Sequence, residues 1–228
     1  MTDLIVAVPS RGRPRAIREL SDAFLETCLR DTELVVIIDD DDPEIDQYCE
    51  DAQELDAYEL VIGPRRRIGP TLNYYMPELA LRAPHVGFMG DDHRPRTRGW
   101  DAAYCTALED MGTGVVYGDD LIMGASIPTQ VAMTSNIVLA TGHFVPEGMI
   151  HLWLDNAWKS IGEATSLRYL PQVVVEHRHP IAGKAEWDES YRENNADAVF
   201  EADRLRYEEW RVNELPEWVR KIQEYNGG

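Results

Sequence analysis

Short apolar runs rich in β-branched residues recur along the first half of this 228-residue chain, and segments with helical spacing separate them. Five runs predict buried strands: Leu4–Val8, Leu34–Ile38, Tyr58–Ile62, Val86–Met89 and Gly114–Tyr117. The segments between them predict helices: Pro14 to about Leu29, Glu44–Leu55, Thr71–Leu81 with an interruption at Pro77, and Arg98–Asp110. Strands that alternate with helices in this way are typical of an α/β fold with a mostly parallel, twisted sheet.

The rhythm changes after Asp120. The later part predicts an antiparallel strand over Gln130–Val138, a helix over Met149–Ile161 and a further strand over Ser166–Val175. It also predicts two C-terminal helices, separated near Pro216, within Lys184–Tyr225. No linker composition marks a boundary near Asp120. We therefore expect a single domain over residues 1–228, divided into about 1–120, about 121–182 and a helical extension over 183–228.

Composition narrows the classes of function. The formal net charge is −19, whereas proteins that grip nucleic-acid phosphates are usually basic. The three cysteines, Cys28, Cys49 and Cys105, form no CxxC pair, which argues against a cysteine zinc site and indicates a reducing compartment. No apolar run approaches the length of a membrane span, and no signal peptide precedes the first strand. We expect a cytoplasmic protein.

Charged turns follow several of the predicted strands. They are Asp39–Asp42, Arg65–Arg67, Asp91-Asp92 and His177–His179. Because the carboxyl ends of parallel strands share one edge of a sheet, these turns are expected to converge on one ligand. Carboxylates and imidazole together suit Mn²⁺ or Mg²⁺, and arginine offsets phosphate charge. The pattern indicates a nucleoside diphosphate or triphosphate ligand, although each turn taken alone is equally typical of solvated surface.

Two common phosphate-binding motifs are absent from the sequence. There is no Gly-x-x-x-x-Gly-Lys-Ser/Thr loop, and no Gly-x-Gly-x-x-Gly follows the first strand. A P-loop ATPase and a dinucleotide-dependent dehydrogenase are therefore disfavoured. Without a glycine-rich cradle, a metal ion and arginines would have to hold the phosphates.

Several segments, in this order, resemble the GT-A fold glycosyltransferases, most closely family 2. They are Val6-Ala-Val-Pro-Ser-Arg11, Val36-Ile-Ile-Asp39-Asp40, Phe88-Met-Gly-Asp91-Asp92, Val116-Tyr-Gly-Asp119, Leu154-Asp155 and Val175-Glu-His177. The resemblance covers roughly residues 3 to 180, and it rests on the order of the segments because no single motif is strong. The pair Asp91-Asp92 stands where the family has its Asp-x-Asp-like motif.

The resemblance implies roles in binding a nucleotide-sugar donor. Asp39 would accept a hydrogen bond from the nucleobase, typically uracil, and Pro9 and Arg11 would border the base and ribose. Asp91 would lie near the ribose, and Asp92 would ligate the metal. A solvated turn with charge at a helix N-terminus explains the neighbours Asp41 and Asp42 equally well.

Further donor contacts are implied on two loops. Arg67, or its neighbours Arg65 and Arg66, would face the diphosphate or the sugar, ahead of the helix that carries Asn73. Lys184 would reach phosphate from a loop that closes over the donor.

Asp155 would be the general base that deprotonates the acceptor hydroxyl in an inverting reaction. The sequence has Leu154-Asp155 where the family usually has Glu-Asp, and a helix cap is the alternative role for Asp155. His177 would be the second metal ligand, with His179 as its substitute, and His93 adjoins the metal pair.

The residues that would bind the acceptor are harder to predict from the sequence. Trp153, Trp158 and His151 are candidates to line the acceptor side, because aromatic faces suit sugar rings, although helical spacing argues equally that Trp153 is core. The expected function is metal-dependent transfer of a sugar from a UDP-sugar to a hydroxyl. A nucleotidyltransferase acting on a sugar phosphate and a non-catalytic nucleotide-sugar-binding module are the alternatives. The acceptor stays open among protein, glycan, small molecule and modified nucleic acid.

Overall fold

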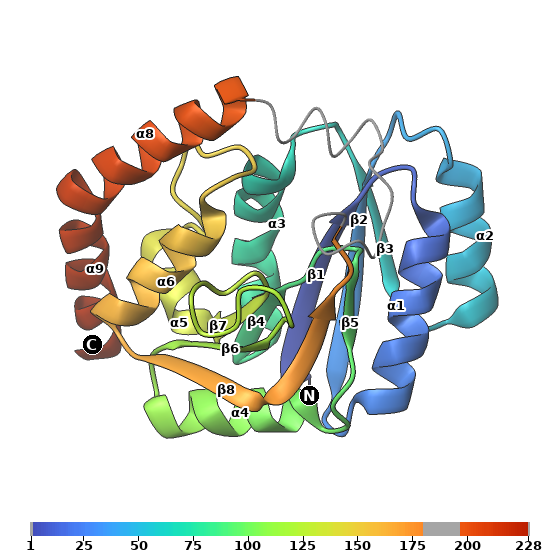
Figure 1. Cartoon of the computed structure of the whole chain (residues 1–228), viewed down its shortest axis with the longest axis horizontal. Coiled ribbons are helices and arrows are strands. Elements are labelled where there is room, and N and C mark those ends of the chain that lie inside the picture. Colours follow the sequence, from blue (N-terminus) through green and yellow to red (C-terminus); the bar gives the residue numbers. More distant parts are fainter. Residues whose placement is uncertain (1, 180–196, 228) are drawn as a thin grey trace.

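The computed structural model describes residues 2–179 and 197–227 and contains one eight-stranded mixed sheet with helices on both faces (Figure 1). The strands are β1 (Leu4–Ser10), β2 (Thr32–Asp39), β3 (Glu59–Gly63), β4 (His85–Phe88), β5 (His93–Pro95), β6 (Val115–Asp119), β7 (Val131–Thr134) and β8 (Leu167–His177). The helices are α1 (Pro14–Thr27), α2 (Ile45–Leu55), α3 (Ile68–Arg82), α4 (Trp100–Met111), α5 (Ser135–Thr141), α6 (Leu154–Ala164), α8 (Asp197–Asn213) and α9 (Leu215–Gly227). The predicted α/β fold class is confirmed.

The strand order is β3-β2-β1-β4-β7-β6-β8-β5. The first four strands in this order run parallel, so the chain leaves β1, β2 and β4 at the same edge. Strand β7 runs antiparallel to both of its neighbours, as expected, and β8 then runs parallel to β6. The short strand β5, which the sequence did not predict, pairs antiparallel with the end of β8.

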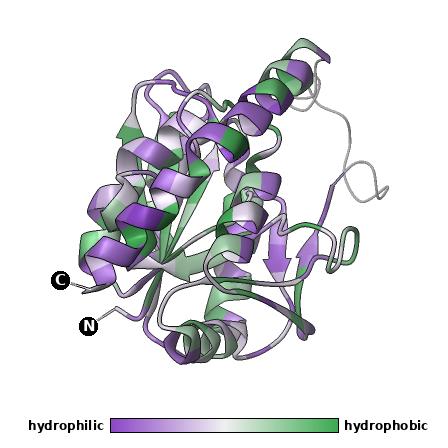
Figure 2. Cartoon of the chain, turned by 90° about the vertical axis from the view of Figure 1, so that its left-hand side faces the viewer, coloured by the Kyte–Doolittle hydropathy of each residue, from purple (hydrophilic) through white to green (hydrophobic). Residues whose placement is uncertain are grey.

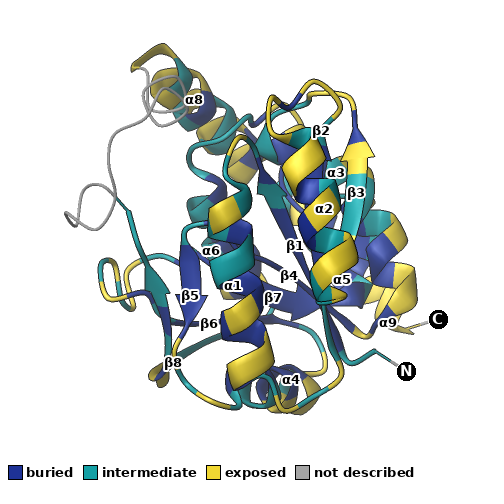
Figure 3. Ribbon diagram, turned by 90° about the vertical axis from the view of Figure 1, so that its right-hand side faces the viewer, coloured by how far each residue is buried: buried dark blue, intermediate teal, exposed yellow. Residues whose placement is uncertain are grey.

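The core lies on both faces of the sheet because the central strands are mostly apolar and buried on both sides. In β1, Ile5 and Ala7 join one cluster of buried side chains, while Leu4, Val6 and Val8 join the other. Helices α3, α5 and α6 cover the first face, with α8 and α9 packed on them. Helices α1 and α4 cover the second face, and α2 adds the buried side chain of Tyr48. Hydrophobic residues concentrate in the strands and on the helix faces turned toward them, and the outer faces of α1 and α2 are exposed (Figures 2 and 3).

Three element predictions were wrong in detail. Helix α3 runs through Pro77 without interruption, because the residues around it, Met76 and Leu79, are buried in the core. The run Gln130–Val138 is not one strand, since β7 ends at Thr134 and α5 begins at Ser135. The expected helix from Met149 begins only at Leu154, and residues 149–153 form a loop.

The C-terminal helices α8 and α9 pack against the sheet-covering helices. Helix α9 lies against α5, and α8 contacts α6 and α9. Trp210 and Trp218 are buried there with ring centroids 5.3 Å apart. Pro216 occupies the first turn of α9, where proline costs no hydrogen bond. Among the described residues, no helix combines the length and apolarity needed to cross a bilayer.

Candidate active site

A cleft of about 300 Å³ opens at the edge of the sheet where β1, β2 and β4 end. It brings together residues that are far apart in the sequence. Those singled out from the sequence that line it are Pro9, Arg11, Asp39, Arg65, Arg67, Asp91, Asp92, His93, His151, Asp155, Trp158, His177 and His179. Parallel strand order brings the turns after β1, β2 and β4 to this edge, and the loop before α6 with the first turns of α6 forms the opposite wall.

Asp92, His93 and His177 form a compact group whose possible ligand atoms lie within 4.8 Å of one another. The pairing of β5 with β8 sets His93 directly opposite His177, and their rings stack with centroids 4.3 Å apart. Nε2 of His177 lies 3.3 Å from Oδ2 of Asp92. The backbone holds this arrangement as well, because Arg178 N donates to the Asp92 carbonyl.

The donor set fits a divalent cation through two of these three side chains. Nδ1 of His93 accepts a hydrogen bond of 2.9 Å from the Gly90 N–H, which assigns the ring proton to Nε2. Neither nitrogen of His93 then has a free lone pair for a metal. Asp92 and His177 remain, and one carboxylate oxygen with one imidazole nitrogen suits Mn²⁺ better than Mg²⁺.

His177 is oriented by Asp120, a residue for which the sequence predicted no role in the site. Nδ1 of His177 lies 3.9 Å from Oδ2 of Asp120, and His177 N donates to the Asp120 carbonyl. Burial opposes protonation of His177, but Asp120 and Asp92 outweigh it and raise the pKa of His177 to about 9. Without a bound cation His177 is therefore protonated at neutral pH. A metal ion held by Nε2 and Asp92 would displace the Nε2 proton, with the Asp120 carboxylate behind the ring.

The two adjacent carboxylates differ in environment. Burial raises the pKa of Asp91 against the opposing charge of Arg13. Its oxygens accept hydrogen bonds from Ser10 Oγ at 2.7 Å and Arg13 Nη1 at 3.0 Å. Burial acts on Asp92 too, but the hydrogen bond and charge of His177 outweigh it and hold the pKa of Asp92 well below its ordinary value. Asp92 is therefore the carboxylate poised to hold a cation.

At the far end of the cleft, Asp39 ends β2 and pairs with Arg11. Nη1 of Arg11 lies 2.9 Å from Asp39 Oδ2 and 2.6 Å from Asp41 Oδ1. Burial raises the pKa of Asp39, and Arg11 acts against that rise. Arg65 lies farther away, with Nε 3.9 Å from Asp39. The arginine pairing holds the Asp39 carboxylate at the cleft wall.

Arg67 stands where α3 begins, with a positive φ of 71°. A non-glycine residue in this region is strained, and such strain is concentrated at functional sites. Gly69 follows, and a side chain there would meet the Met149 carbonyl at 2.2 Å. Close contact with residues 149–150 thus requires glycine and sets the start of α3 against the opposite wall.

Asn73 is not among the described residues that line the cleft. Its Oδ1 accepts from Phe144 N and Val145 N at 2.9 and 3.0 Å, and its Nδ2 donates to the Val145 carbonyl. These three bonds use the amide to hold the loop between α5 and α6, and the expected donor contact of Asn73 stays a prediction. Lys184, also expected to contact the donor, lies outside the described residues.

Asp155 lies in the first turn of α6 and faces the cleft. Burial raises the pKa of Asp155 to about 6, although its own backbone N–H and the charge of His177 favour the ionised form. A carboxyl group with such a pKa is mostly ionised at pH 7 and can accept a proton, as a general base requires.

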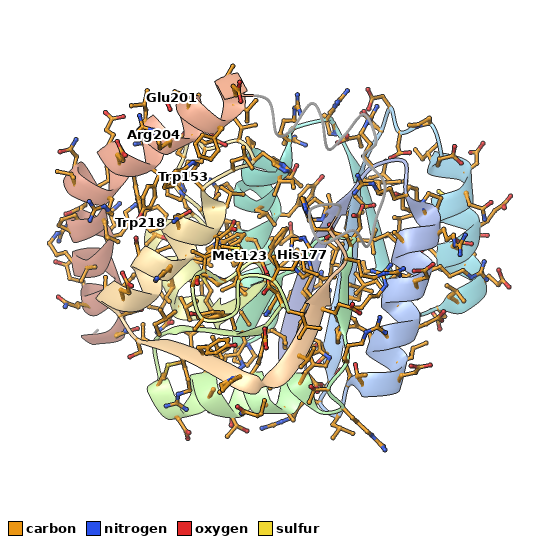
Figure 4. All side chains as sticks on the ribbon, in the orientation of Figure 1. Met123, Trp153, His177, Glu201, Arg204 and Trp218 are labelled. Carbon is orange, nitrogen blue, oxygen red and sulfur yellow. The ribbon has the colours of Figure 1, made fainter. Side chains whose placement is uncertain are left out.

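The aromatic candidates divide. Trp158 is buried core that reaches the cleft wall, and its Nε1 donates to the Phe144 carbonyl. Trp153 instead packs on α8, 5.4 Å from the ring of Tyr207 and 5.5 Å from that of Phe200. Figure 4 shows Trp153 between α6 and α8 and His177 near the centre of the molecule.

Similarity to known proteins is found among solved structures and not among sequences. No protein-family model matches the sequence, and no curated protein matches it. Among solved structures, a mannosyltransferase from Pyrobaculum calidifontis in complex with GDP-Man and Mn²⁺ superposes with a TM-score of 0.61 at 14% identity, over 98% of this chain and 74% of that one.

Two further structures superpose over nearly the whole chain. Residues 1–349 of TarS from S. aureus in complex with UDP give a TM-score of 0.59 at 11% identity, covering 100% of this chain and 92% of that one. A protein described as a nucleotide-diphospho-sugar transferase from Desulfovibrio desulfuricans G20 gives 0.53 at 12% identity, with 99% of each chain covered. The chain therefore has the fold of nucleotide-sugar glycosyltransferases, and the expected GT-A fold is confirmed.

Proposed function

We propose that this protein is a metal-dependent glycosyltransferase that moves a sugar from a nucleoside-diphosphate sugar to an acceptor hydroxyl. One observation carries the proposal. A single cleft joins the Asp92–His177 pair, suited to a divalent cation, with Asp155, a carboxylate whose pKa burial raises to about 6. The shared fold with proteins solved in complex with GDP-Man and Mn²⁺ or with UDP supports the same assignment.

The donor would lie along the edge of the sheet. Asp39 accepts a hydrogen bond from the nucleobase, for which we propose uracil, and Pro9 and Arg11 border the base and ribose. The diphosphate then extends toward Asp92 and His177, and Asp91 stands behind the metal ligand, tied to Ser10 and Arg13.

Asp92 and His177 would hold the metal, Mn²⁺ or Mg²⁺, which stabilises negative charge on the departing diphosphate. Arg67 adds positive charge from the start of α3. Both contributions act on the leaving group. The residues of the chain therefore supply leaving-group stabilisation and proton transfer at separate places in one cleft.

Asp155 would act as the base. The acceptor oxygen forms a bond to the anomeric carbon while the bond from that carbon to the diphosphate oxygen breaks. The hydroxyl proton passes to an Asp155 oxygen, and the nucleoside diphosphate leaves with the bonding electrons. A direct attack of this kind inverts the anomeric configuration.

Product analysis tests the reaction class. The protein is incubated with UDP-sugars or GDP-sugars, Mn²⁺ and a panel of hydroxyl acceptors, including water. Metal-dependent release of a nucleoside diphosphate with an inverted glycoside is the expected result. Release of pyrophosphate from a nucleoside triphosphate and a sugar phosphate would instead identify a nucleotidyltransferase. Donor binding without turnover across the panel would identify a binding module.

A further inference from the structure

Helix α8 carries one buried acid, Asp203, whose side chain is 1% exposed. Its Oδ1 accepts a hydrogen bond from Ile150 N, and its Oδ2 accepts from His151 N and Leu152 N, each at 2.8 Å. Among the described residues, the hydrogen bonds to the Asp203 side chain come from these backbone groups. Three successive N–H groups thus compensate one buried carboxylate.

The loop held by Asp203 forms one wall of the cleft. His151 and Leu152 line the cleft, and the Ile150 carbonyl accepts from Gly69 N at 2.9 Å. The same loop therefore abuts the start of α3, two residues after Arg67. Burial lowers the pKa of His151 to about 4, so its ring is neutral at pH 7.

The loop also leads directly into the helix that carries Asp155. Trp153, the residue before α6, has a positive φ of 63° and packs against Phe200 and Tyr207 of α8. A strained conformation persists only where surrounding structure over-determines it. Asp203 on one side and the aromatic pair on the other provide that constraint, as Figure 4 shows for Trp153 beside α8.

We infer that Asp203 is a positioning residue for the proposed transfer reaction: from α8 it fixes residues 150–152, and through them the cleft wall between Arg67 and Asp155. The inference rests on the proposed function. Helix α8 then does more than cover the core. It lies beyond residues 3 to 180, where the resemblance to glycosyltransferases was found, and it holds the loop that completes the cleft.

The test compares Asp203→Asn with the control Tyr207→Phe. The Asn side chain keeps the shape but loses the charge and turns one acceptor into a donor that faces the loop N–H groups. Tyr207→Phe keeps the aromatic ring that packs on Trp153. It removes only the bond of 2.9 Å between Tyr207 Oη and Ser160 Oγ, which also joins α8 to α6, and it leaves residues 150–152 untouched. Both variants weaken helix packing, and only the first releases the loop.

Two readouts are taken well below the unfolding temperature: amide hydrogen exchange over residues 149–154, and kcat and KM for the donor, corrected for the fraction of protein that binds donor. Asp203→Asn should speed exchange at residues 150–152 and lower kcat about 10- to 100-fold, the effect of misplacement by about 1 Å, with donor KM much less affected. Tyr207→Phe should leave both near wild type. Asp203→Glu, which keeps a carboxylate but displaces it, should fold and also lower kcat.

If amide exchange at residues 150–152 is as slow in Asp203→Asn as in the wild type, Asp203 does not hold the loop. Wild-type kcat in both folded Asp203 variants, with the loop released, would overturn the positioning role. If the wild-type protein neither binds nor turns over any nucleotide sugar, the proposed function fails, and the exchange measurement still decides whether Asp203 holds the loop.

Discussion

Asp39 ends β2, and Asp92 lies in the turn that follows β4. His151 and the start of α6 depend instead on Asp203, which lies 52 residues after His151 in the chain. The first wall of the cleft is built by parallel strands, which deliver their exit turns to one edge whatever the turns contain. The opposite wall is built by loops, and buried carboxylates give those loops their shape.

Asp120 shows the same construction on the other side of His177. Its Oδ1 accepts from the backbone N–H groups of residues 122, 123 and 124 at 2.9, 2.7 and 3.0 Å, and its Oδ2 accepts from Thr129 Oγ1 at 2.8 Å. Asp120 is 2% exposed and Asp203 is 1% exposed. In these two loops no strand pairing fixes the backbone, and a buried aspartate that accepts several backbone N–H bonds holds it instead.

The largest expected effect falls on the loop-built wall. Asp155→Asn should lower the rate of transfer about 10²- to 10⁴-fold, the usual contribution of a general base, while donor affinity stays close to wild type. Steady-state turnover and calorimetric donor binding measure the two quantities. A parallel loss of both would mean that Asp155 belongs to the donor-binding wall and would break the comparison.

The same residue gives a prediction for stability and pH. Folded protein keeps the Asp155 proton up to about pH 6 because of burial, whereas an unfolded aspartate releases it near pH 3.9. The folded state therefore binds more protons in between, and this group makes stability fall as pH rises through that window. In metal-free protein at pH 7, Asp155→Asn should raise the free energy of unfolding by about 1–3 kcal/mol.

Denaturant unfolding at pH 4 and pH 7 measures this gain, which should be smaller at pH 4. A helix-capping role makes the opposite prediction, since loss of a first-turn carboxylate would destabilise α6. Turnover should follow the same ionisation, with kcat/KM rising through about pH 6 as Asp155 loses its proton.

A smaller effect is expected at the strand-built wall. Asp39→Asn should weaken binding of UDP about tenfold, the usual loss for one hydrogen bond to a charged group, and it should narrow any preference between uridine and guanosine nucleotides. Asp41→Asn is the matched control, because Asp41 is the other partner of Arg11 and its side chain is 57% exposed. Equal losses in the two variants would assign the effect to Arg11 and not to the base.

The smallest effect on donor affinity is expected at Asn73. Asn73→Ala leaves the buried N–H groups of Phe144 and Val145 without their acceptor, which should destabilise the fold by about 1–3 kcal/mol. Calorimetry should find wild-type affinity for nucleoside diphosphate in the folded variant. A marked loss of affinity would restore Asn73 to the donor site.

The difference between the walls also explains what the sequence could predict. Strand-end carboxylates such as Asp92 were found because apolar runs mark strands and parallel order sets their exits. The task of Asp203 had no local signal, since it is defined only when α8 packs against residues 150–152. The start of α5 at Ser135 also had no local signal. Ser135 donates from its N–H to the Pro84 carbonyl and from its Oγ to the Ala83 carbonyl, and these bonds help end β7 and begin α5 within a run that predicted one strand.

His93 is an intermediate case. Its position beside Asp92 was visible in the sequence, but β5 has only three residues and its pairing with β8 gave no periodic pattern. That pairing explains why His177 meets Asp92. The choice of His177 over His93 as metal ligand depends on the Gly90 hydrogen bond, which only the folded backbone reveals.

The most direct test of the account is calorimetric titration of UDP into the protein with and without Mn²⁺, repeated with Asp92→Asn and with Asp110→Asn, an exposed acid paired with Arg168. The account predicts that Mn²⁺ strengthens UDP binding to the wild type and to Asp110→Asn, and that this gain vanishes in Asp92→Asn while the weak metal-free binding persists. Metal-strengthened binding that survives in Asp92→Asn would contradict the proposed metal site.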